Sequence, residues 1–233
     1  MHLSELFYTI QGEGKLAGVP SVFVRASGCN LRCTWCDTPY ASWNPEGDDV
    51  SVGEIVERSI AFPADHIVLT GGEPMIMPEI VELAQALKSR GKHITVETAG
   101  TIFKPMPIDL ASVSPKLSNS TPLEREGGRF AQLHDAQRRR PDVVQAFIDN
   151  ARRSAADFQL KFVVAGEVDL AEVDGLLAEL TGWSRSDVLL MPEGTSVESL
   201  RAKTGWLAEL CKCRGFRLAP RLHVELYGNM RGT

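Results

Sequence analysis

The chain has 233 residues, of which 43% are hydrophobic and 24% are charged, and its formal net charge is −5. This composition is ordinary for a globular protein, and it argues against an electrostatic hold on nucleic acid or on an anionic membrane. The first residues lack the pattern of a signal peptide, and no apolar run reaches the about 18 residues that a membrane helix needs. The five cysteines, an odd number, predict reduced thiols in a cytoplasmic protein.

Patterns of strand and helix alternate along the chain. The apolar runs that predict strands are 21–27, 66–70, 93–97, 110–114, 158–164 and 187–191. The helical patterns begin near Ser51, Pro78, Pro141, Asp169 and Thr195. This alternation predicts an α/β fold with a parallel sheet of about six strands. Only residues 98–109, which include two prolines, separate the third strand from the fourth, so one helix of the repeat is missing.

The sequence shows no internal repeat, linker or change of composition, so residues 1–233 are predicted to form a single domain. A polar segment at about 117–140 is predicted to be an excursion or a lid. Its end carries the run Arg138, Arg139 and Arg140, which we interpret as a solvated approach to the next helix rather than an anion site.

Three of the five cysteines, Cys29, Cys33 and Cys36, lie within eight positions. As thiolates they are soft ligands suited to iron–sulfur clusters, zinc or copper(I). A four-iron cluster and a structural zinc site each normally take four protein ligands, so three thiols leave one metal position open for substrate chemistry. Two alternatives remain: a zinc site completed by Cys211 or Cys213, and a disulfide pair with one leftover thiol.

The unusual motifs follow the ends of the predicted strands. CNLRCTWCD follows the first strand, TGGEP the second, ETAGT the third, SPK the fourth and PEG the sixth. Barrel enzymes with parallel strands build their active sites at this carboxyl end. A structural zinc site would not explain why glycine-rich and polar motifs gather at one edge, so this placement favours an open iron–sulfur cluster.

Three of these motifs offer groups that suit a cofactor. Gly71 and Gly72 let the backbone approach a ligand closely, and Glu73 can accept hydrogen bonds from an amine. Further groups, suited to a ribose and a carboxylate, are Glu97, Thr98, Ser114 and Lys116. Taken singly, each of them could also belong to an ordinary turn or helix cap.

CNLRCTWC, with an aromatic residue before its last cysteine, and GGEP after the second strand resemble the radical S-adenosylmethionine enzymes. The resemblance implies a 4Fe-4S cluster on the three cysteines and an S-adenosylmethionine whose amino acid end chelates the fourth iron. Reduction of this pair gives a 5′-deoxyadenosyl radical that takes a hydrogen atom from the substrate. The residues expected to bind the cofactor are Trp35, Cys36, Asp37, Gly71, Gly72, Glu73, Glu97, Thr98, Ser114, Pro115 and Lys116.

A narrower resemblance, to the 7-carboxy-7-deazaguanine synthase family, covers most of the chain. It rests on FYTIQGEG, FVRASGCNLRCTWCDT, TGGEP, ETAGT, SPK and YGNMRGT, which occur in the order of that family. It implies conversion of 6-carboxy-5,6,7,8-tetrahydropterin to 7-carboxy-7-deazaguanine with loss of ammonia, a carbon–nitrogen lyase reaction of queuosine biosynthesis. It also implies Mg²⁺, a homodimer, an electron donor such as a flavodoxin, and an incomplete TIM-like barrel with few helices.

The substrate residues expected in this chain are Ile10, Gln11, Gly12, Glu13, Arg25, Thr70, His223 and Thr233. Glu13 and Arg25 are expected to be catalytic, with Arg25 holding the substrate carboxylate through its planar fork. Thr38 is expected to ligate Mg²⁺, whose other ligands come from substrate and water. Alternatively, Arg25 pairs with a surface acid and Thr38 caps the cysteine loop.

Two rival functions remain. A glycyl-radical activating enzyme would share the cysteines and GGE but act on a protein partner, and QGEG and the terminal RGT argue against it. A zinc- or cluster-bearing binding protein would need neither S-adenosylmethionine nor a reductant. Two parts of the chain depart from the synthase family, namely MPEG after the sixth strand and the segment 117–140.

Overall fold

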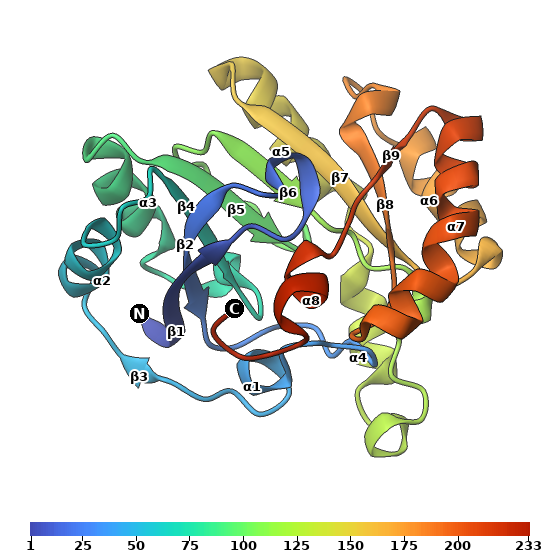
Figure 1. Ribbon diagram of the computed structural model, residues 1–233, viewed down its shortest axis with the longest axis horizontal. Coiled ribbons are helices and arrows are strands. Elements are labelled where there is room, and N and C mark those ends of the chain that lie inside the picture. Colours follow the sequence, from blue (N-terminus) through green and yellow to red (C-terminus); the bar gives the residue numbers. More distant parts are fainter.

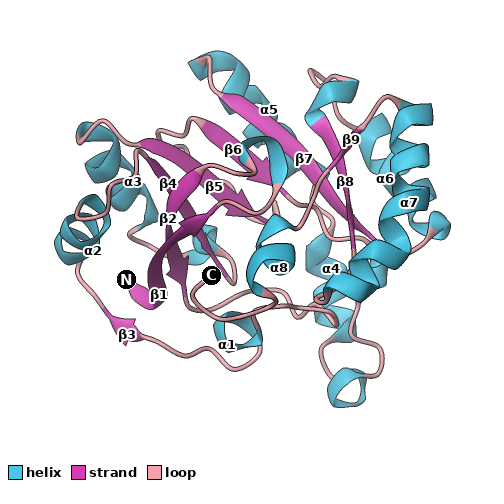
Figure 2. Cartoon of the chain, viewed as in Figure 1, coloured by secondary structure: helices cyan, strands magenta, loops and turns pink.

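The computed structural model describes residues 1–233 and contains one nine-stranded sheet (Figures 1 and 2). The strands are β1 His2–Ile10, β2 Pro20–Ala26, β3 Asp48–Asp49, β4 His66–Gly71, β5 His93–Thr98, β6 Leu110–Val113, β7 Asp157–Val164, β8 Val188–Pro192 and β9 Arg217–Leu218. Their order across the sheet is β3-β1-β2-β4-β5-β6-β7-β8-β9.

Every neighbouring pair from β2 to β9 is parallel, whereas β1 is antiparallel to both β2 and β3. The strands β2, β4, β5, β6, β7 and β8 are the six that the apolar runs predicted. The edge strands β3 and β9 are not paired with each other, so the barrel is incomplete, as expected.

Strand β1 is not evident from the sequence. Its register shifts between Leu3 and Glu5, and such a bulge breaks the strict alternation that marks a strand in sequence. Because β1 runs antiparallel to β2, the loop that follows it starts at the amino end of the parallel strands. This loop enters the barrel, where the Lys15 ammonium bonds Asp157 at the start of β7 at 2.7 Å. Gly14 is required there, because its φ is +75° and an added Cβ would lie 2.2 Å from the Gln159 amide.

The helices are α1 Pro39–Ser42, α2 Val52–Ile60, α3 Ile80–Ser89, α4 Ala131–Arg138, α5 Pro141–Ser154, α6 Leu170–Ala178, α7 Val197–Arg214 and α8 Leu222–Tyr227. Helices α2, α3, α5, α6 and α7 cover the outer face of the sheet and share its large apolar core (Figure 2). Ser51 caps α2 by accepting a hydrogen bond from the Glu54 amide at 3.2 Å, as its sequence pattern suggested. The short helix α8 was not predicted. None of these helices combines the length and the apolar character needed to cross a bilayer.

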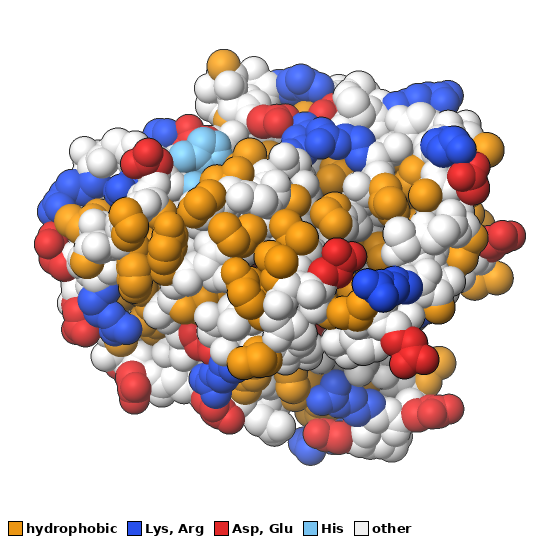
Figure 3. Space-filling view, in the orientation of Figure 1, with side chains coloured by type: hydrophobic (Ala, Val, Ile, Leu, Met, Phe, Trp, Pro, Cys, Tyr) orange, Lys and Arg blue, Asp and Glu red, His pale blue; other side chains and the backbone are white.

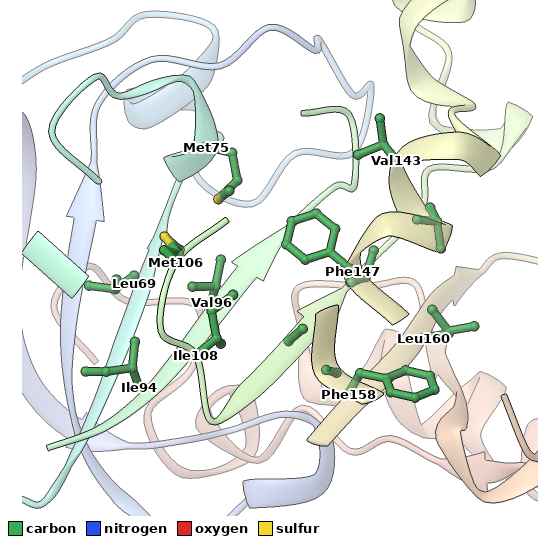
Figure 4. Close-up of a cluster of buried hydrophobic side chains, with 14 of the residues drawn as sticks. Leu69, Met75, Ile94, Val96, Met106, Ile108, Val143, Phe147, Phe158 and Leu160 are labelled. Atoms are coloured by element: carbon green, nitrogen blue, oxygen red, sulfur yellow. The ribbon is translucent and has the colours of Figure 1, made fainter. Parts of the chain in front are cut away.

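No helix separates β5 from β6, in agreement with the sequence prediction. The connection between them instead buries Met106 and Ile108 in the same core as Leu69 and Val96 (Figure 4). Phe147 of α5 fills the neighbouring space. Two apolar side chains of an extended segment therefore replace a helix as the cover of the sheet.

The segment 117–140 holds two short 3₁₀ turns and the helix α4. His134 of α4 is buried beneath the cysteine loop. Its Nδ1 accepts from the Arg32 amide at 3.0 Å, and its Nε2 lies 2.9 Å from the Ser120 hydroxyl, which itself donates to the Leu117 carbonyl. Part of the excursion therefore supports the cysteine loop.

The arginine run at the end of this segment is ion-paired. Arg138 is buried between Asp135 and Glu172, while Arg139 and Arg140 pair with other carboxylates nearer the surface. The prediction of a solvated run is wrong for Arg138, because two carboxylates compensate its charge and allow it to be buried.

Candidate active site

A cavity of about 230 Å³ lies at the carboxyl ends of the parallel strands. Its walls come from the ends of β4 to β8, the cysteine loop, α8 and the C-terminal segment 229–233, and the loop after β1 reaches into it. Every residue predicted to bind substrate, cofactor or metal lines this cavity, except Glu73 and Pro115. The topology therefore collects motifs that are dispersed over almost the entire sequence.

The three clustered cysteines all line the cavity, and all five cysteines of the chain are free thiols, so no disulfide forms. Burial raises the pKa of Cys29 and of Cys33 to about 12, so metal binding must displace protons from them. No group of three or more His, Cys, Asp and Glu side chains is arranged around one position suitable for a single metal ion. Cys211 is buried in the apolar core and Cys213 is exposed, and neither lines the cavity. The donor set fits a 4Fe-4S cluster, which three thiolates would hold and which would keep one iron without a protein ligand.

The shape of the cysteine loop is imposed by its neighbours. Trp43 donates from its indole Nε1 to the Cys33 carbonyl at 3.0 Å, and the Thr34 amide donates to the Ser120 carbonyl at 2.8 Å. Arg125 donates to the Thr34 carbonyl at 3.1 Å. The loop is therefore held from two sides independently of any metal.

The TGGEP motif packs directly on this loop. The Gly72 amide donates to the Ala26 carbonyl at 3.2 Å. An added Cβ on Gly72 would lie 2.3 Å from the carbonyl oxygen of Gly28 and 2.4 Å from that of Ala41. Gly71 has φ of +148°, and its Cβ would lie 2.3 Å from the Ala26 carbonyl. Both glycines are thus needed for the close approach of two backbones, and both line the cavity.

Glu73 of the TGGEP motif is held by donors within the chain. Its carboxylate is fully buried and already accepts from the Met75 amide at 3.1 Å, the Thr98 hydroxyl at 2.7 Å and the Ala99 amide at 2.8 Å. Burial raises the pKa of Glu73 even though these donors oppose the shift. The carboxylate holds the loop after β5 and lies outside the cavity lining, and direct binding of a cofactor amine by Glu73 stays a prediction. Pro115 is also buried outside the cavity lining.

The other predicted cofactor residues divide into two groups. Ser114, Lys116 and Trp35 lie together, with the Lys116 ammonium 2.9 Å from the Ser114 hydroxyl and 5.7 Å from the centre of the Trp35 ring. Glu97 belongs to the second group, because its carboxylate accepts hydrogen bonds from the side chains of Gln11 and Thr70, each at 3.1 Å. The structure thus places Glu97 among the predicted substrate residues.

Glu13 is the centre of a buried charge network. One of its carboxylate oxygens pairs with Lys161 of β7, and the other lies 3.1 Å from Arg221. Burial alone would raise the pKa of Glu13, but the positive charges of Lys161 and Arg221 bring it well below its usual range. Glu13 is therefore ionised at neutral pH, and both Glu13 and Lys161 line the cavity.

The chain after β9 closes over the same loop. The Leu222 amide donates to the Gly12 carbonyl at 2.9 Å, and a Cβ on Gly12 would lie 2.0 Å from the His223 ring. Burial lowers the pKa of His223, although the nearby Glu13 opposes this shift. His223 and Thr233 both line the cavity, as expected from the sequence.

Arg25 pairs with an acid, but the side chain of that acid, Glu5, is only 9% exposed and so is not the surface acid of the alternative. The Arg25 Nε donates to Glu5 at 2.8 Å, and Glu5 also accepts from the Tyr40 hydroxyl at 3.1 Å and from Arg231 at 2.6 Å. The two Nη nitrogens of Arg25 make no hydrogen bond within the chain, and the residue lines the cavity. Arg25 is therefore fixed by an acid on one side and free to bind a carboxylate on the other.

Thr38 and Ile10 line the cavity as predicted. The Thr38 hydroxyl lies 3.8 Å from the Cys36 sulfur and makes no capping bond to α1. This contact lies within the cysteine loop, so it is compatible with the alternative that Thr38 caps that loop.

Sequence reasoning missed two charged residues of the site, Lys161 and Arg221. Lys161 had a signal, because it interrupts the otherwise apolar end of the strand 158–164 and a charged residue is rarely buried without a partner. Arg221 had no such signal in the sequence, because its partners Glu13 and Asp37 lie at the other end of the chain.

An incomplete parallel barrel with three cysteines after its first parallel strand, facing a cavity at the carboxyl ends of the strands, defines the radical S-adenosylmethionine class of enzymes. The model of the Radical SAM superfamily matches residues 23–121. The crystal structure of Streptococcus suis SuiB bound to precursor peptide SuiA shares the fold alone, at 12% identity and a TM-score of 0.56, with 84% of this chain and 47% of that chain covered.

Closer relatives narrow this class. The 7-carboxy-7-deazaguanine synthase of Halobacterium salinarum is 47% identical, with 99% of this chain and 92% of that protein covered, and the one of Rhodopirellula baltica is 44% identical, with 99% and 88% covered. The crystal structure of QueE from Escherichia coli has a TM-score of 0.66 at 26% identity, with 95% of this chain and 94% of that chain covered. The chain belongs to the 7-carboxy-7-deazaguanine synthase family and is a radical S-adenosylmethionine enzyme.

Proposed function

We propose that this protein converts 6-carboxy-5,6,7,8-tetrahydropterin to 7-carboxy-7-deazaguanine with loss of ammonia, as a carbon–nitrogen lyase of 7-deazaguanine biosynthesis. The observation that carries the proposal is the single cavity, which joins the three-cysteine loop to a polar substrate side in a chain of this family. A glycyl-radical activating enzyme is not favoured, because the relatives that match nearly the whole chain are synthases.

Cys29, Cys33 and Cys36 would hold a 4Fe-4S cluster, and Gly71, Gly72, Ser114 and Lys116 would hold S-adenosylmethionine beside it. When bound, this pair supplies a 5′-deoxyadenosyl radical that can remove a hydrogen atom from the substrate. The remaining tasks, which are binding the pterin, orienting it and excluding water, fall to the side chains of the chain itself.

The substrate ring is expected to bind between the loop after β1 and the end of β5. Glu97 holds Gln11 and Thr70 through one bond to each of its oxygens, which leaves further acceptor positions on the carboxylate. A pterin presents N–H donors along one edge, so Glu97 and the ionised Glu13 suit that edge. Lys161 balances the negative charge that these two carboxylates bring into the cavity.

The carboxylate of the substrate is expected to bind the free Nη nitrogens of Arg25. Because Glu5 fixes Arg25 through its Nε, the guanidinium plane is already oriented before substrate arrives. Arg231 contacts the same Glu5, so the C-terminal segment is tied to the carboxylate end of the cavity. Thr233 of this segment lines the same cavity and is proposed to contact the substrate ring.

Thr38 is proposed as the protein ligand of Mg²⁺. Mg²⁺ is a hard cation that prefers oxygen ligands and keeps several waters. A threonine hydroxyl that lines the cavity and makes no capping bond to α1 supplies one such oxygen, and the substrate carboxylate supplies another. Because Thr38 belongs to the cysteine loop, Mg²⁺ held by it would help that loop to bind the substrate carboxylate.

A second copy of the chain is proposed as a partner on the face that carries β1 and α8. Apolar side chains gather there in the centre of the view, with charged groups mostly around them (Figure 3). The exposed apolar side chains of β1, α8 and the segment after α8 are Tyr8, Leu226, Tyr227 and Met230. Tyr8 and Tyr227 also line one shallow hollow, which a matching surface could fill. A small reducing protein such as a flavodoxin and a cytoplasmic setting complete the proposal, and the free thiols support a reducing environment.

The test is a turnover assay. The protein is reconstituted anaerobically with iron and sulfide and incubated with S-adenosylmethionine, a chemical reductant, Mg²⁺ and the carboxylated pterin. Mass spectrometry should detect 7-carboxy-7-deazaguanine together with ammonia. Formation of 5′-deoxyadenosine without any deazaguanine product would refute the assignment of the substrate and leave the enzyme class standing.

A further inference from the structure

Arg221, the residue before α8, joins three segments that are far apart in the sequence. Its Nε donates to Glu13 in the loop after β1 at 3.1 Å. Its Nη2 donates to the Asp37 carboxylate in the cysteine loop, and its Nη1 donates to the Gly194 carbonyl after β8. The guanidinium is buried, so these three bonds account for its place in the fold.

The contact with Gly194 explains the PEG motif, which the substrate and cofactor residues leave unused. Gly194 has a φ of +151°, and an added Cβ would lie 2.5 Å from the Ser199 hydroxyl. The glycine therefore lets the chain turn from β8 into α7 while its carbonyl oxygen accepts from Arg221. The carbonyl group at the end of β8 thus holds one side of the Arg221 guanidinium in place.

The two carboxylates that Arg221 binds belong to different loops of the cavity. Glu13 stands in the substrate loop, and Asp37 lies directly after the last cysteine, Cys36. Both carboxylates line the cavity, whereas Arg221 itself does not. Arg221 therefore acts through other residues and touches neither substrate nor cofactor.

The bonds of Arg221 are not equally replaceable. Glu13 keeps a second ion pair with Lys161 when Arg221 is absent. Asp37 has no other ion pair or side-chain hydrogen bond in the chain. Loss of the guanidinium should therefore release the end of the cysteine loop more than it releases the substrate loop.

We propose that Arg221 is a positioning residue that couples the substrate side of the cavity to the cluster side by holding Glu13 and Asp37 in one fixed relation. This inference rests on the proposed function for the identity of the substrate. Its structural content, the fixed position of residues 34–41 relative to the substrate loop, does not depend on that identity.

The experiment compares Arg221→Gln and Arg221→Lys with the wild type and with Arg214→Gln, a control that removes a surface arginine paired with Asp174. The first readout is amide hydrogen exchange of the full chain without pterin. In Arg221→Gln we expect exchange of residues 34–41 to rise at least tenfold and that of residues 11–18 to rise less. Arg221→Lys should restore part of the protection, since a point charge cannot make three bonds in one plane. Arg214→Gln should match the wild type.

The second readout is the number of 5′-deoxyadenosine molecules formed per deazaguanine product. It should rise at least fivefold in Arg221→Gln while the iron content per chain stays at the wild-type value, and Arg221→Lys should lie between the two. Unchanged exchange at 34–41, or a parallel fall of both products at a constant ratio, would overturn the inference. If Arg221→Gln does not fold, hydrogen exchange is measured on Arg221→Lys, Asp37→Asn and Glu13→Gln instead. Of the last two, only Asp37→Asn should strongly raise the exchange of residues 34–41. A wild type that makes no deazaguanine would contradict the proposed function, while the exchange result would still decide the role of Arg221.

Discussion

The two sides of the cavity are held together by different forces. On the cluster side, the loops after β2 and β4 meet through backbone hydrogen bonds and through glycines packed on carbonyl groups, as at Gly72. On the substrate side, the loop after β1, β7 and the chain before α8 meet through the ion pairs of Glu13, Lys161 and Arg221. The cluster side therefore depends on backbone shape, and the substrate side depends on balanced buried charge.

This difference separates the variants that should damage each side. Replacing a closely packed glycine such as Gly72 by alanine places a methyl group against rigid backbone carbonyls, but it changes no charge. Removal of one charge from a buried network leaves an uncompensated partner, although the volume is nearly unchanged. Paired variants of the two kinds should therefore affect cofactor binding and substrate binding selectively.

The largest effect is expected from Cys29→Ala, Cys33→Ala or Cys36→Ala, each of which should abolish cluster formation and with it all cleavage of S-adenosylmethionine. Three thiolates and no fourth ligand nearby leave nothing to replace a lost one. Iron content and visible absorption after anaerobic reconstitution measure the result. Cys211→Ala and Cys213→Ala are the matched controls and should bind a full cluster. Cluster loss in these controls, with the loop variants unharmed, would contradict the assignment.

Lys161→Met should destabilise the fold by about 3 kcal/mol, because it leaves Glu13 buried with only Arg221 to balance it. The free energy of unfolding from denaturant titration measures the change. The same replacement at Lys212, which forms an exposed pair with Glu209, should change it by less than about 0.5 kcal/mol. Equal effects at both positions would show that the buried network does not stabilise the substrate side.

Gly72→Ala should destabilise the fold by about 2 kcal/mol and weaken S-adenosylmethionine binding, because the added methyl group would lie 2.3 Å from the Gly28 carbonyl oxygen. Gly53→Ala is the matched control within α2, where a Cβ meets no atom within 4 Å. There the replacement should stabilise the helix by up to about 1 kcal/mol. Denaturant titration and equilibrium binding check both values. A Gly72 variant that binds S-adenosylmethionine normally would argue against close backbone packing on the cluster side.

Arg25→Ala should reduce pterin turnover at least tenfold and spare the slow cleavage of S-adenosylmethionine that occurs without product. Each charge-assisted bond to the substrate carboxylate contributes about 1.5–3 kcal/mol, so the loss of even one exceeds a factor of ten. Arg25→Lys should recover only part of the rate, since it lacks the planar fork. Steady-state rates of both products provide the comparison. Wild-type turnover in Arg25→Ala would exclude the proposed substrate position.

The smallest effect concerns pH and the support of the cysteine loop by His134. Burial, together with the charge of Arg138, lowers the pKa of His134 to about 4, below its ordinary value near 6.5. Above pH 6.5 its stabilising contribution is complete, and it declines as the pH falls toward 4 because only the unfolded chain then binds the proton. Protonation destabilises the folded state because Nδ1 of His134 accepts a hydrogen bond from the Arg32 amide and loses this bond when it is protonated.

We expect His134→Gln to remove this contribution, so that its stability deficit relative to the wild type shrinks by about 0.8 kcal/mol between pH 8 and pH 6. Denaturant titrations of both proteins at the two pH values measure this difference. His66, whose burial also lowers its pKa to about 4, contributes equally to both proteins and cancels. A deficit that is the same at both pH values would show that His134 titrates normally.

The cluster side was largely predictable from the sequence, because its determinants are local. Each parallel strand is a short apolar run, and each motif follows its strand directly, so the rule for carboxyl ends places them together. Glu73 is the exception. A carboxylate after two glycines suggests a ligand contact. In the fold, however, the Thr98 hydroxyl and the Ala99 amide, at the end of another strand, donate hydrogen bonds to it.

The substrate side was predictable only as a set of residues, and only through resemblance to a family. Its geometry depends on pairs such as Glu13 with Arg221, which are 208 positions apart and have no shared local pattern. Strand β1 was hidden by its bulge, and α8 is too short to show a helical repeat. The periodicity of apolar residues indicates which face of a strand or helix is buried. It does not indicate which charged residues, far apart in the sequence, form ion pairs.

The long separation of these ion pairs has a consequence for the order in which the protein forms during synthesis. The contacts of the cysteine loop with the excursion need no residue beyond 140, and that of Arg32 with His134 spans 102 positions. The Glu13 network must wait for Arg221, which is synthesised 208 positions after Glu13. The entropic cost of closing so long a loop grows only slowly with its length, so the final structure loses little by this arrangement. A nascent chain is thus expected to form the contact of Arg32 with His134 first, and to fix residues 34–41 and the substrate side only after Arg221 has been made.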